Sequence, residues 1–104
     1  MAFMIFFVTV PNLDKGKEIA LALVKNKLAA CVNIVQNVIS IYKWKGNVEE
    51  DAESLLIIKT KEDKSDLLIK KINELHNYEI PECIGFKIEK VSDNYLNWIR
   101  ENVE

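Results

Sequence analysis

Apolar and polar positions along the chain distinguish strands from helices. Residues 3–10, FMIFFVTV, form a nearly continuous apolar run, which is typical of a central strand buried on both faces. Pro11 ends this strand, and Asn12 or Asp14 can cap a helix that runs to about Ala30. The apolar stripe of this helix recurs at helical spacing and contains Ile19, Ala20, Leu23, Val24, Leu28 and Ala30.

A second extended region covers residues 31–44, where two sets of side chains alternate. Gln36–Asn37 interrupts the alternation, which predicts a strand with a bulge or kink. Gly46–Asn47 lies between β-forming segments and predicts a two-residue hairpin loop, followed by a strand over residues 48–60. In that register paired residue numbers sum to 93, which places Lys43 opposite Glu50 and Trp44 opposite Glu49.

The C-terminal half predicts a helix, a strand and a last helix. Thr60-x-x-Asp63 or Asp63-x-x-Asp66 can start the second helix, which ends near His76–Asn77. Pro81 keeps residues 78–82 in a loop, and residues 83–91, CIGFKIEKV, predict a fourth strand. Ser92 or Asp93 caps the last helix. The apolar faces of the two helices are Leu68, Ile72 and Leu75, then Tyr95, Trp98, Ile99 and Val103.

The predicted order is β-α-β-β-α-β-α, which indicates an α+β fold of the ferredoxin-like split β-α-β type with an extra C-terminal helix. We expect one domain over residues 1–104 and a sheet order of 4-1-3-2, so that the second and fourth strands are edges. A hairpin strand of fourteen residues spans ~46 Å, whereas a compact chain of this length is about 33 Å across. The hairpin is therefore expected to pack on another copy of the chain; the alternative is a hairpin curled over its own sheet.

Composition narrows the class of protein. Hydrophobic residues make up 49% of the 104 residues, enough for a folded core, and the formal net charge is −2. The basic residues are scattered, so no nucleic-acid partner is expected. The eight-residue apolar run near the N-terminus is too short for a bilayer, which needs roughly 20 residues, and it is a poor signal peptide. We therefore expect a cytoplasmic protein with two free thiols and no membrane association.

His76 is the only histidine, and with Glu79 and Glu82 it forms a His-x2-Glu-x2-Glu spacing. Imidazole and carboxylates together suit Cu, Zn or Ni, so these three residues are the candidate metal ligands, for a weakly bound ion and no required cofactor. The alternative is a polar loop that closes a helix C-terminus, where histidine is favourable. Pro81 excludes a helix that would place all three side chains on one face.

Other candidates lie on the hairpin and the last helix. Alternation places Glu49, Asp51 and Glu53 on one face, either as a cation-attracting surface or as a solvated face with salt bridges between subunits. Cys31 and Cys83 fall on opposite sheet edges, roughly 14 Å apart, as structural thiols. Aromatic and apolar candidates divide into subunit-interface residues (Tyr42, Trp44, Val48 and Cys31) and pocket-wall residues (Tyr78, Tyr95 and Trp98).

Several motifs occur together in one order. They are Phe7-Val8-Thr9-x-Pro11, Leu28-Ala29-Ala30-Cys31-Val32-Asn33-Ile34, Ser40-x-Tyr42-x-Trp44-x-Gly46 continuing through Glu49, Asp51 and Glu53 to Leu56-Ile57-Ile58-Lys59-Thr60, His76-x-Tyr78-Glu79-x-Pro81-Glu82, and Tyr95-Leu96-x-Trp98. Across residues 7–98 the chain resembles the CutA divalent-cation tolerance family. The resemblance implies a ferredoxin-like domain assembled as a tight trimer that is similar to the PII signalling proteins.

The chain departs from the family pattern at the metal ligands. In bacterial members a first-strand cysteine and a histidine pair have been put forward as copper ligands, and the resemblance places Val8 and Leu75-His76 at those positions. Only His76 carries over. Further departures are Gln36–Asn37, Asn77, Cys83 and Lys87.

The resemblance implies a non-enzymatic homotrimer that binds or senses divalent metal ions, copper by family association. A second interpretation is a PII-like signalling or scaffold module that holds a small ligand or partner between subunits. A third is a hydrolase that uses His76 and nearby carboxylates. The sequence places no nucleophile beside His76 and contains no phosphate-binding loop or metalloenzyme motif, so catalysis is not expected.

Overall fold

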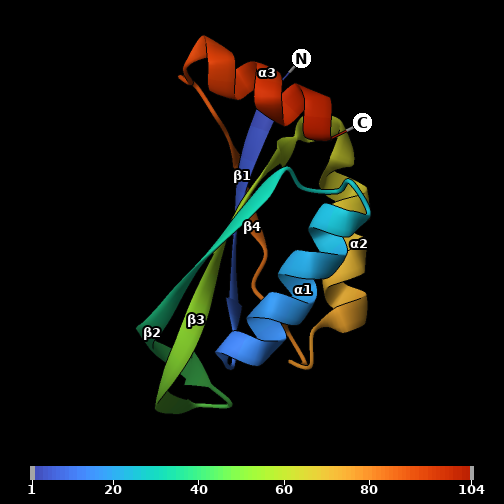
Figure 1. Cartoon of the computed structure of the whole chain (residues 1–104). Coiled ribbons are helices and arrows are strands. Elements are labelled where there is room, and N and C mark those ends of the chain that lie inside the picture. The colour runs from blue at the N-terminus through green and yellow to red at the C-terminus, as the bar shows by residue number, and fades with distance from the viewer. Residues whose placement is uncertain (1, 104) are drawn as a thin grey trace.

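The computed structural model describes residues 2–103 and has the predicted element order (Figure 1). Its four-stranded antiparallel sheet has the order β2-β3-β1-β4, which confirms the ferredoxin-like topology. The elements are β1 (Phe3–Val10), α1 (Leu13–Lys25), β2 (Cys31–Trp44), β3 (Asn47–Lys61), the 3-10 turn η1 (Glu62–Lys64), α2 (Ser65–Leu75), β4 (Ile84–Lys87) and α3 (Asp93–Asn102).

Helices α1 and α2 cover one face of the sheet, and α3 lies across one end (Figure 1). Alternate residues of β1 point toward α1 and α2, and with Ile19, Leu23, Leu68 and Ile72 of the helices they form the main core. A second, smaller cluster joins α3 to the start of β1 through Phe3, Ala30, Ile99 and Val103. No helix within residues 2–103 is long and apolar enough to cross a membrane.

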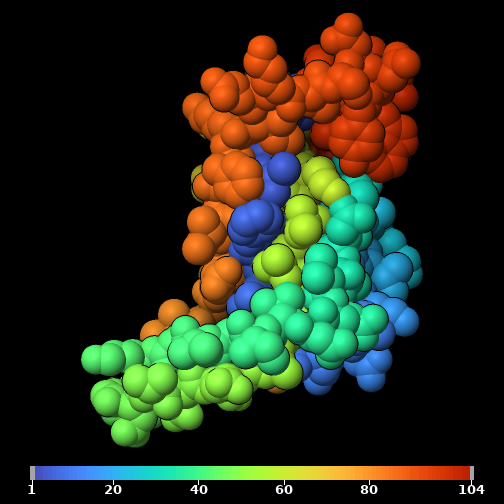
Figure 2. All heavy atoms as spheres, turned by 90° about the vertical axis from the view of Figure 1, so that its left-hand side faces the viewer, coloured from blue at the N-terminus to red at the C-terminus, as the bar shows by residue number. Residues whose placement is uncertain are grey.

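The opposite face of the sheet carries no helix (Figure 2). We call it the open face, and its apolar side chains are Ile5, Phe7, Val35, Leu55, Ile57, Ile84 and Phe86, placed together by strand pairing. Phe7 and Phe86 meet edge to face, with ring centroids 5.3 Å apart. Several of these side chains remain exposed, Phe86 by 43%. The fold therefore leaves one of the two faces of its sheet without an apolar element packed on it.

Helix α1 begins as predicted and ends earlier than predicted. The side chain of Asn12 accepts a hydrogen bond from the backbone N–H of Lys15 at 2.8 Å, which confirms one of the two expected caps. The helix was expected to reach Ala30, but it ends at Lys25 because Lys27 adopts a left-handed φ of 57°. The following backbone instead turns toward the sheet, where Ala30 donates to the carbonyl of Lys59.

Strand β2 contains the predicted irregularity. The pairing of β2 with β3 shifts between Val35 and Val38, and Asn37 adopts a φ of 61°. An extra residue in one strand of a pair bends that strand and increases its twist. The interruption at Gln36–Asn37 therefore marks where the hairpin leaves the body of the sheet.

The predicted hairpin register is wrong by two residues. The loop consists of Lys45 and Gly46, which have φ angles of 52° and 85°, and Trp44 pairs with Asn47. Positive φ at both loop residues is the geometry of the type I′ turn, whose twist matches the flanking strands. The expected pair of Lys43 with Glu50 does not form, because Lys43 lies opposite Val48.

The C-terminal elements differ from prediction at their ends. Neither Thr60 nor Asp63 caps α2, whose N-cap position is occupied by Lys64. The hydroxyl of Thr60 instead donates to the buried carbonyl of Leu28 at 2.7 Å. Strand β4 has four residues where nine were expected. Its partner β1 begins at Phe3, so Ile88 makes the last contact and residues 89–91 have no strand beside them.

The β2–β3 hairpin projects from the body as an arm, residues 38–53 (Figure 2). The molecule measures 44 × 25 × 22 Å along its principal axes, in keeping with the overhang expected from strand length. The outer side of the arm exposes Ile39, Ile41 and Val48 by 60% or more. Packing of the arm on a second copy stays a prediction.

Candidate functional site

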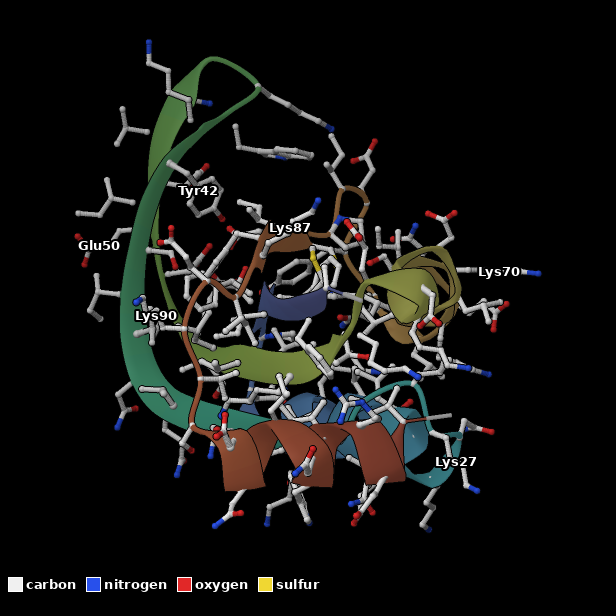
Figure 3. The ribbon with its side chains drawn as sticks, turned by 90° about the horizontal axis from the view of Figure 1, so that it is seen from above. Lys27, Tyr42, Glu50, Lys70, Lys87 and Lys90 are labelled. Carbon is white, nitrogen blue, oxygen red and sulfur yellow. The ribbon has the colours of Figure 1, made fainter. Side chains whose placement is uncertain are left out.

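A cavity of about 410 Å³ lies where the arm meets the segment that follows α2. Strand alternation explains one wall, because residues two apart on a strand point to the same side. Tyr42 points to the concave side of the bent hairpin and Glu50 points away from it (Figure 3). The lining residues are Thr9, Ser40, Tyr42, Trp44, Asp51, Glu53, Asn77, Tyr78, Glu79, Ile80 and Glu82.

His76 anchors the second wall to the sheet. Helix α2 ends at Leu75, and His76 continues in extended conformation. Its Nε2 lies 2.7 Å from the carbonyl oxygen of Thr9, and its Nδ1 lies 3.2 Å from the backbone nitrogen of Tyr78. A carbonyl only accepts, so Nε2 carries the proton, while Nδ1 accepts from the N–H of Tyr78. Both ring nitrogens of this buried histidine are therefore engaged.

Two tyrosines donate to two carboxylates across the cavity. The hydroxyl of Tyr78 lies 2.6 Å from Oε2 of Glu53, a buried side chain, and the hydroxyl of Tyr42 donates to Asp51. Burial and then the bond to Glu53 raise the pKa of Tyr78. The bond to Asp51 is the main cause that raises the pKa of Tyr42 to about 12. Each phenol thus remains a donor well above neutral pH.

The cavity is strongly acidic. Its lining includes Asp51, Glu53, Glu79 and Glu82, and it includes no lysine, arginine or histidine. Within residues 2–103 none of these four carboxylates forms a salt bridge. The cavity therefore presents negative charge that no salt bridge among the described residues neutralises.

The structure separates the three residues predicted as metal ligands. Glu79 and Glu82 line the cavity, whereas His76 lies behind its wall and bonds to backbone. Across residues 2–103, no three His, Cys, Asp or Glu side chains approach closely enough to hold a metal ion. A site built on His76 would first have to give up one of its two backbone hydrogen bonds. The donor atoms of this one chain therefore do not fit a tightly coordinated metal.

The predicted pocket-wall residues lie in two places. Tyr78 lines the cavity. Tyr95 and Trp98 stack on each other in α3 with ring centroids 5.4 Å apart, at the end of the sheet where β2 begins. Burial, together with the neighbouring Cys31, raises the pKa of Tyr95.

The predicted interface residues also divide. Tyr42 and Trp44 line the cavity, and Val48 is exposed on the outer side of the arm. Cys31 is the first residue of the edge strand β2. Their role in an interface stays a prediction. Cys31 and Cys83 are free thiols, and burial raises the pKa of Cys83 to about 11.

Sequence reasoning missed part of this cavity. Thr9, Ser40, Asn77 and Ile80 line it but were not among the predicted site residues. The alternation that groups Asp51 with Glu53 also groups Ser40 with Tyr42, so the hairpin wall was accessible from the sequence. No periodic signal describes residues 77–82, because they form an irregular segment.

Comparison with known proteins decides the family. The sequence profile of the CutA1 divalent ion tolerance protein matches residues 4–102. This chain belongs to the CutA1 family. It is 45% identical over 98 residues to the protein CutA, chloroplastic, of Arabidopsis thaliana, covering 94% of this chain and 54% of that protein. It is 43% identical to the divalent-cation tolerance protein CutA of Thermus thermophilus, covering 94% and 95%.

Solved CutA1 structures share the fold. The Oryza sativa CutA1 structure superposes with a TM-score of 0.97 at 41% identity, covering 100% of this chain and 95% of that one. The Thermus thermophilus structure gives 0.95 at 41% identity, covering 98% and 99%. This chain spans about half the length of the plant CutA proteins that it matches. Relatives carry the words chloroplastic and periplasmic in their names, so a cytoplasmic location stays a prediction.

Proposed function

We propose that this CutA1-family chain acts without catalysis, as a cytoplasmic homotrimer that gathers divalent metal ions, copper foremost. The acidic cavity carries the proposal: four carboxylates surround it, and no basic side chain of the lining neutralises them. Such a site attracts cations. The engaged ring nitrogens of His76 support a role other than acid–base catalysis.

The proposed metal binding is weak. One chain offers mainly carboxylate oxygens at the cavity, whereas copper prefers nitrogen and sulfur donors. Cu(II) is expected to bind more tightly than Zn(II) and Ni(II). Metal binding is expected to add little to the stability of the fold. Tighter binding requires donors from a second copy.

Calorimetric titration with Cu(II) at pH 7.5 tests this proposal. The double variant Glu79→Gln and Glu82→Gln is expected to lose most of the binding, and His76→Ala is expected to retain it. The predicted ligand set that includes His76 gives the opposite result for His76→Ala. Absence of copper binding by the wild type would remove the metal from the proposal altogether.

The trimer rests on two surfaces. The open face leaves Phe86 and its apolar neighbours without a covering element, and the arm projects with Ile39, Ile41 and Val48 exposed. A closed ring of copies would bury both. Sedimentation equilibrium at low micromolar concentration is expected to give three times 12.0 kDa, and a stable monomer would contradict the assembly.

A second candidate function is a PII-like module that holds a small ligand or partner. The size of the cavity favours it, because about 410 Å³ falls within the range of small-molecule sites. Aromatic walls beside a few convergent polar groups are also typical of such sites. Calorimetry with small molecules, in place of metal ions, distinguishes the two candidates.

A further inference from the structure

The negative charge of the cavity is spread over two walls. Asp51 and Glu53 belong to β3, while Glu79 and Glu82 belong to the segment after α2. No three acidic, histidine or cysteine side chains within residues 2–103 converge on one point. A single small ion would therefore neutralise only part of this charge. An extended cation with several charged groups matches the arrangement better.

The aromatic walls favour an organic cation over an inorganic one. Trp44, Tyr42 and Tyr78 line the same cavity as the carboxylates. The ammonium nitrogen of Lys45 lies 5.7 Å from the centroid of the Trp44 ring, within the range of a cation–π contact. An ammonium group over an indole face is held by the ring quadrupole. The aromatic faces also provide apolar surface for methylene groups.

The hydrogen-bonding capacity of the walls matches ammonium donors. Asp51 and Glu53 each accept one bond from a tyrosine hydroxyl, and an ionised carboxylate can accept about four. The remaining positions can accept hydrogen bonds from the N–H groups of a ligand. The hydroxyls of Thr9 and Ser40 add further acceptors to the lining.

We propose that the cavity binds an aliphatic polyamine. Its ammonium groups bond to the carboxylates of both walls, and its methylene chain lies against Trp44, Tyr42 and Tyr78. The inference rests on the second candidate function and names its ligand class. Primary and secondary amines fit better than quaternary ones, because the carboxylates need N–H donors.

Calorimetric titration of the full chain with spermidine, at pH 7.5 and 150 mM NaCl, is the test. The double variant Glu79→Gln and Glu82→Gln is expected to bind at least tenfold more weakly. Glu50→Gln is the control: Glu50 lies on β3 beside Asp51, and its substitution removes a charge, but its side chain points away from the cavity (Figure 3). The control is expected to change the affinity by less than twofold.

Fluorescence supplies a local readout. In a Trp98→Phe background the remaining indole is Trp44, whose emission is expected to change on spermidine binding and not on addition of an equal ionic strength of NaCl. Trp44→Leu is expected to weaken calorimetric binding about two- to fivefold. An unchanged emission and an unaffected Trp44→Leu variant would overturn the proposed pose.

Three outcomes overturn the proposal. If Mg²⁺ at the same concentration displaced spermidine equally well, the binding would reflect general electrostatic attraction and not a polyamine site. Copper binding without spermidine binding would leave the metal function standing and remove the polyamine. Spermidine binding only to dissociated chains would mean that a second copy fills the cavity. Spermidine binding without copper binding instead supports this inference and removes the metal function.

Discussion

At the scale of single residues, the decisive contact is that of His76. A lone histidine followed by two acidic residues suggests a ligand, yet its Nε2 donates to Thr9 and its Nδ1 accepts from Tyr78. The imidazole thereby connects the end of α2 to the end of β1. It positions the cavity wall, and its value to the protein is structural in this arrangement.

Replacing His76 by alanine should therefore reduce stability. The change leaves a carbonyl and an N–H without their partners in a buried place, which costs about 1–3 kcal/mol. Urea unfolding measures the loss. Asn77→Ala, at an exposed neighbour, should stay within about 0.5 kcal/mol of the wild type; equal effects of the two changes would contradict the structural role.

The tyrosines share an unusual property, because the pKa of each of the three is raised above the ordinary 10.0. The bond to Asp51 is the main cause for Tyr42, whereas burial is the main cause for Tyr78 and Tyr95. The native protein then holds these protons more tightly than the unfolded chain. This contribution to stability is complete below pH 10 and is lost as the pH rises through the folded values.

Absorbance titration at 295 nm checks this property. The folded protein should show no tyrosine ionisation centred at pH 10, whereas the urea-unfolded chain should ionise there. Asp51→Ala should lower the pKa of Tyr42 from about 12 toward 10. About one third of the total absorbance change should then occur near pH 10. A native titration centred at pH 10, with circular dichroism unchanged, would show that the bonds to Asp51 and Glu53 do not form.

At the scale of elements, the hairpin turn determines the arm. Lys45 and Gly46 both have positive φ, which aligns Asp51 opposite Ser40. This register puts the carboxylates on the cavity side. A shift by one residue would move them to the other side of the sheet.

Gly46→Ala isolates the backbone contribution of this turn. A Cβ at Gly46 would meet no atom within 4 Å. The substitution should therefore lower the free energy of unfolding by about 1–2 kcal/mol, through the left-handed conformation alone. Lys45→Asn should have the opposite effect, since asparagine tolerates this region better. Denaturant midpoints measure both changes, and two shifts of the same sign would argue against the type I′ geometry.

The fold was largely predictable because its elements have clear periods. The run at residues 3–10 and the alternation at residues 31–44 determined the central strand and the long hairpin. The turn was misplaced because glycine tolerates either loop position, and only the twist selects Lys45–Gly46. Half of the cavity was harder to predict from the sequence, because residues 77–82 show no hydrophobic periodicity. Their position depends on the hydrogen bonds of His76 and Tyr78 to other elements.

At the scale of the whole molecule, the two sheet faces differ. One is covered by α1 and α2, and the other is bare (Figures 1 and 2). An uncovered apolar face of this kind marks an interaction surface. The arm extends the same sheet beyond the helices, so both exposed regions belong to one continuous element.

Phe86→Lys tests the open face as the surface of assembly. Burying an unpaired ammonium between copies costs about 3–5 kcal/mol, so sedimentation should show dissociation toward 12.0 kDa. Leu21→Lys makes the same chemical change on α1, where Leu21 is 56% exposed, and should leave the assembly intact. Dissociation by both variants, or by neither, would place the contact elsewhere.

The central position of β1 also affects the order in which the protein forms during synthesis. β1 lies between β3 and β4, but the ribosome produces it before either of them. Roughly 75 residues separate Val10 from Lys87, so at about 5–20 residues per second β1 waits roughly 4–15 s for both neighbours. Until β3 has been synthesised, this most apolar strand has two unpaired edges, and its β4 edge stays unpaired to the end of the interval. The nascent chain is therefore most exposed to aggregation or chaperone capture early, well before the arm and the cavity exist.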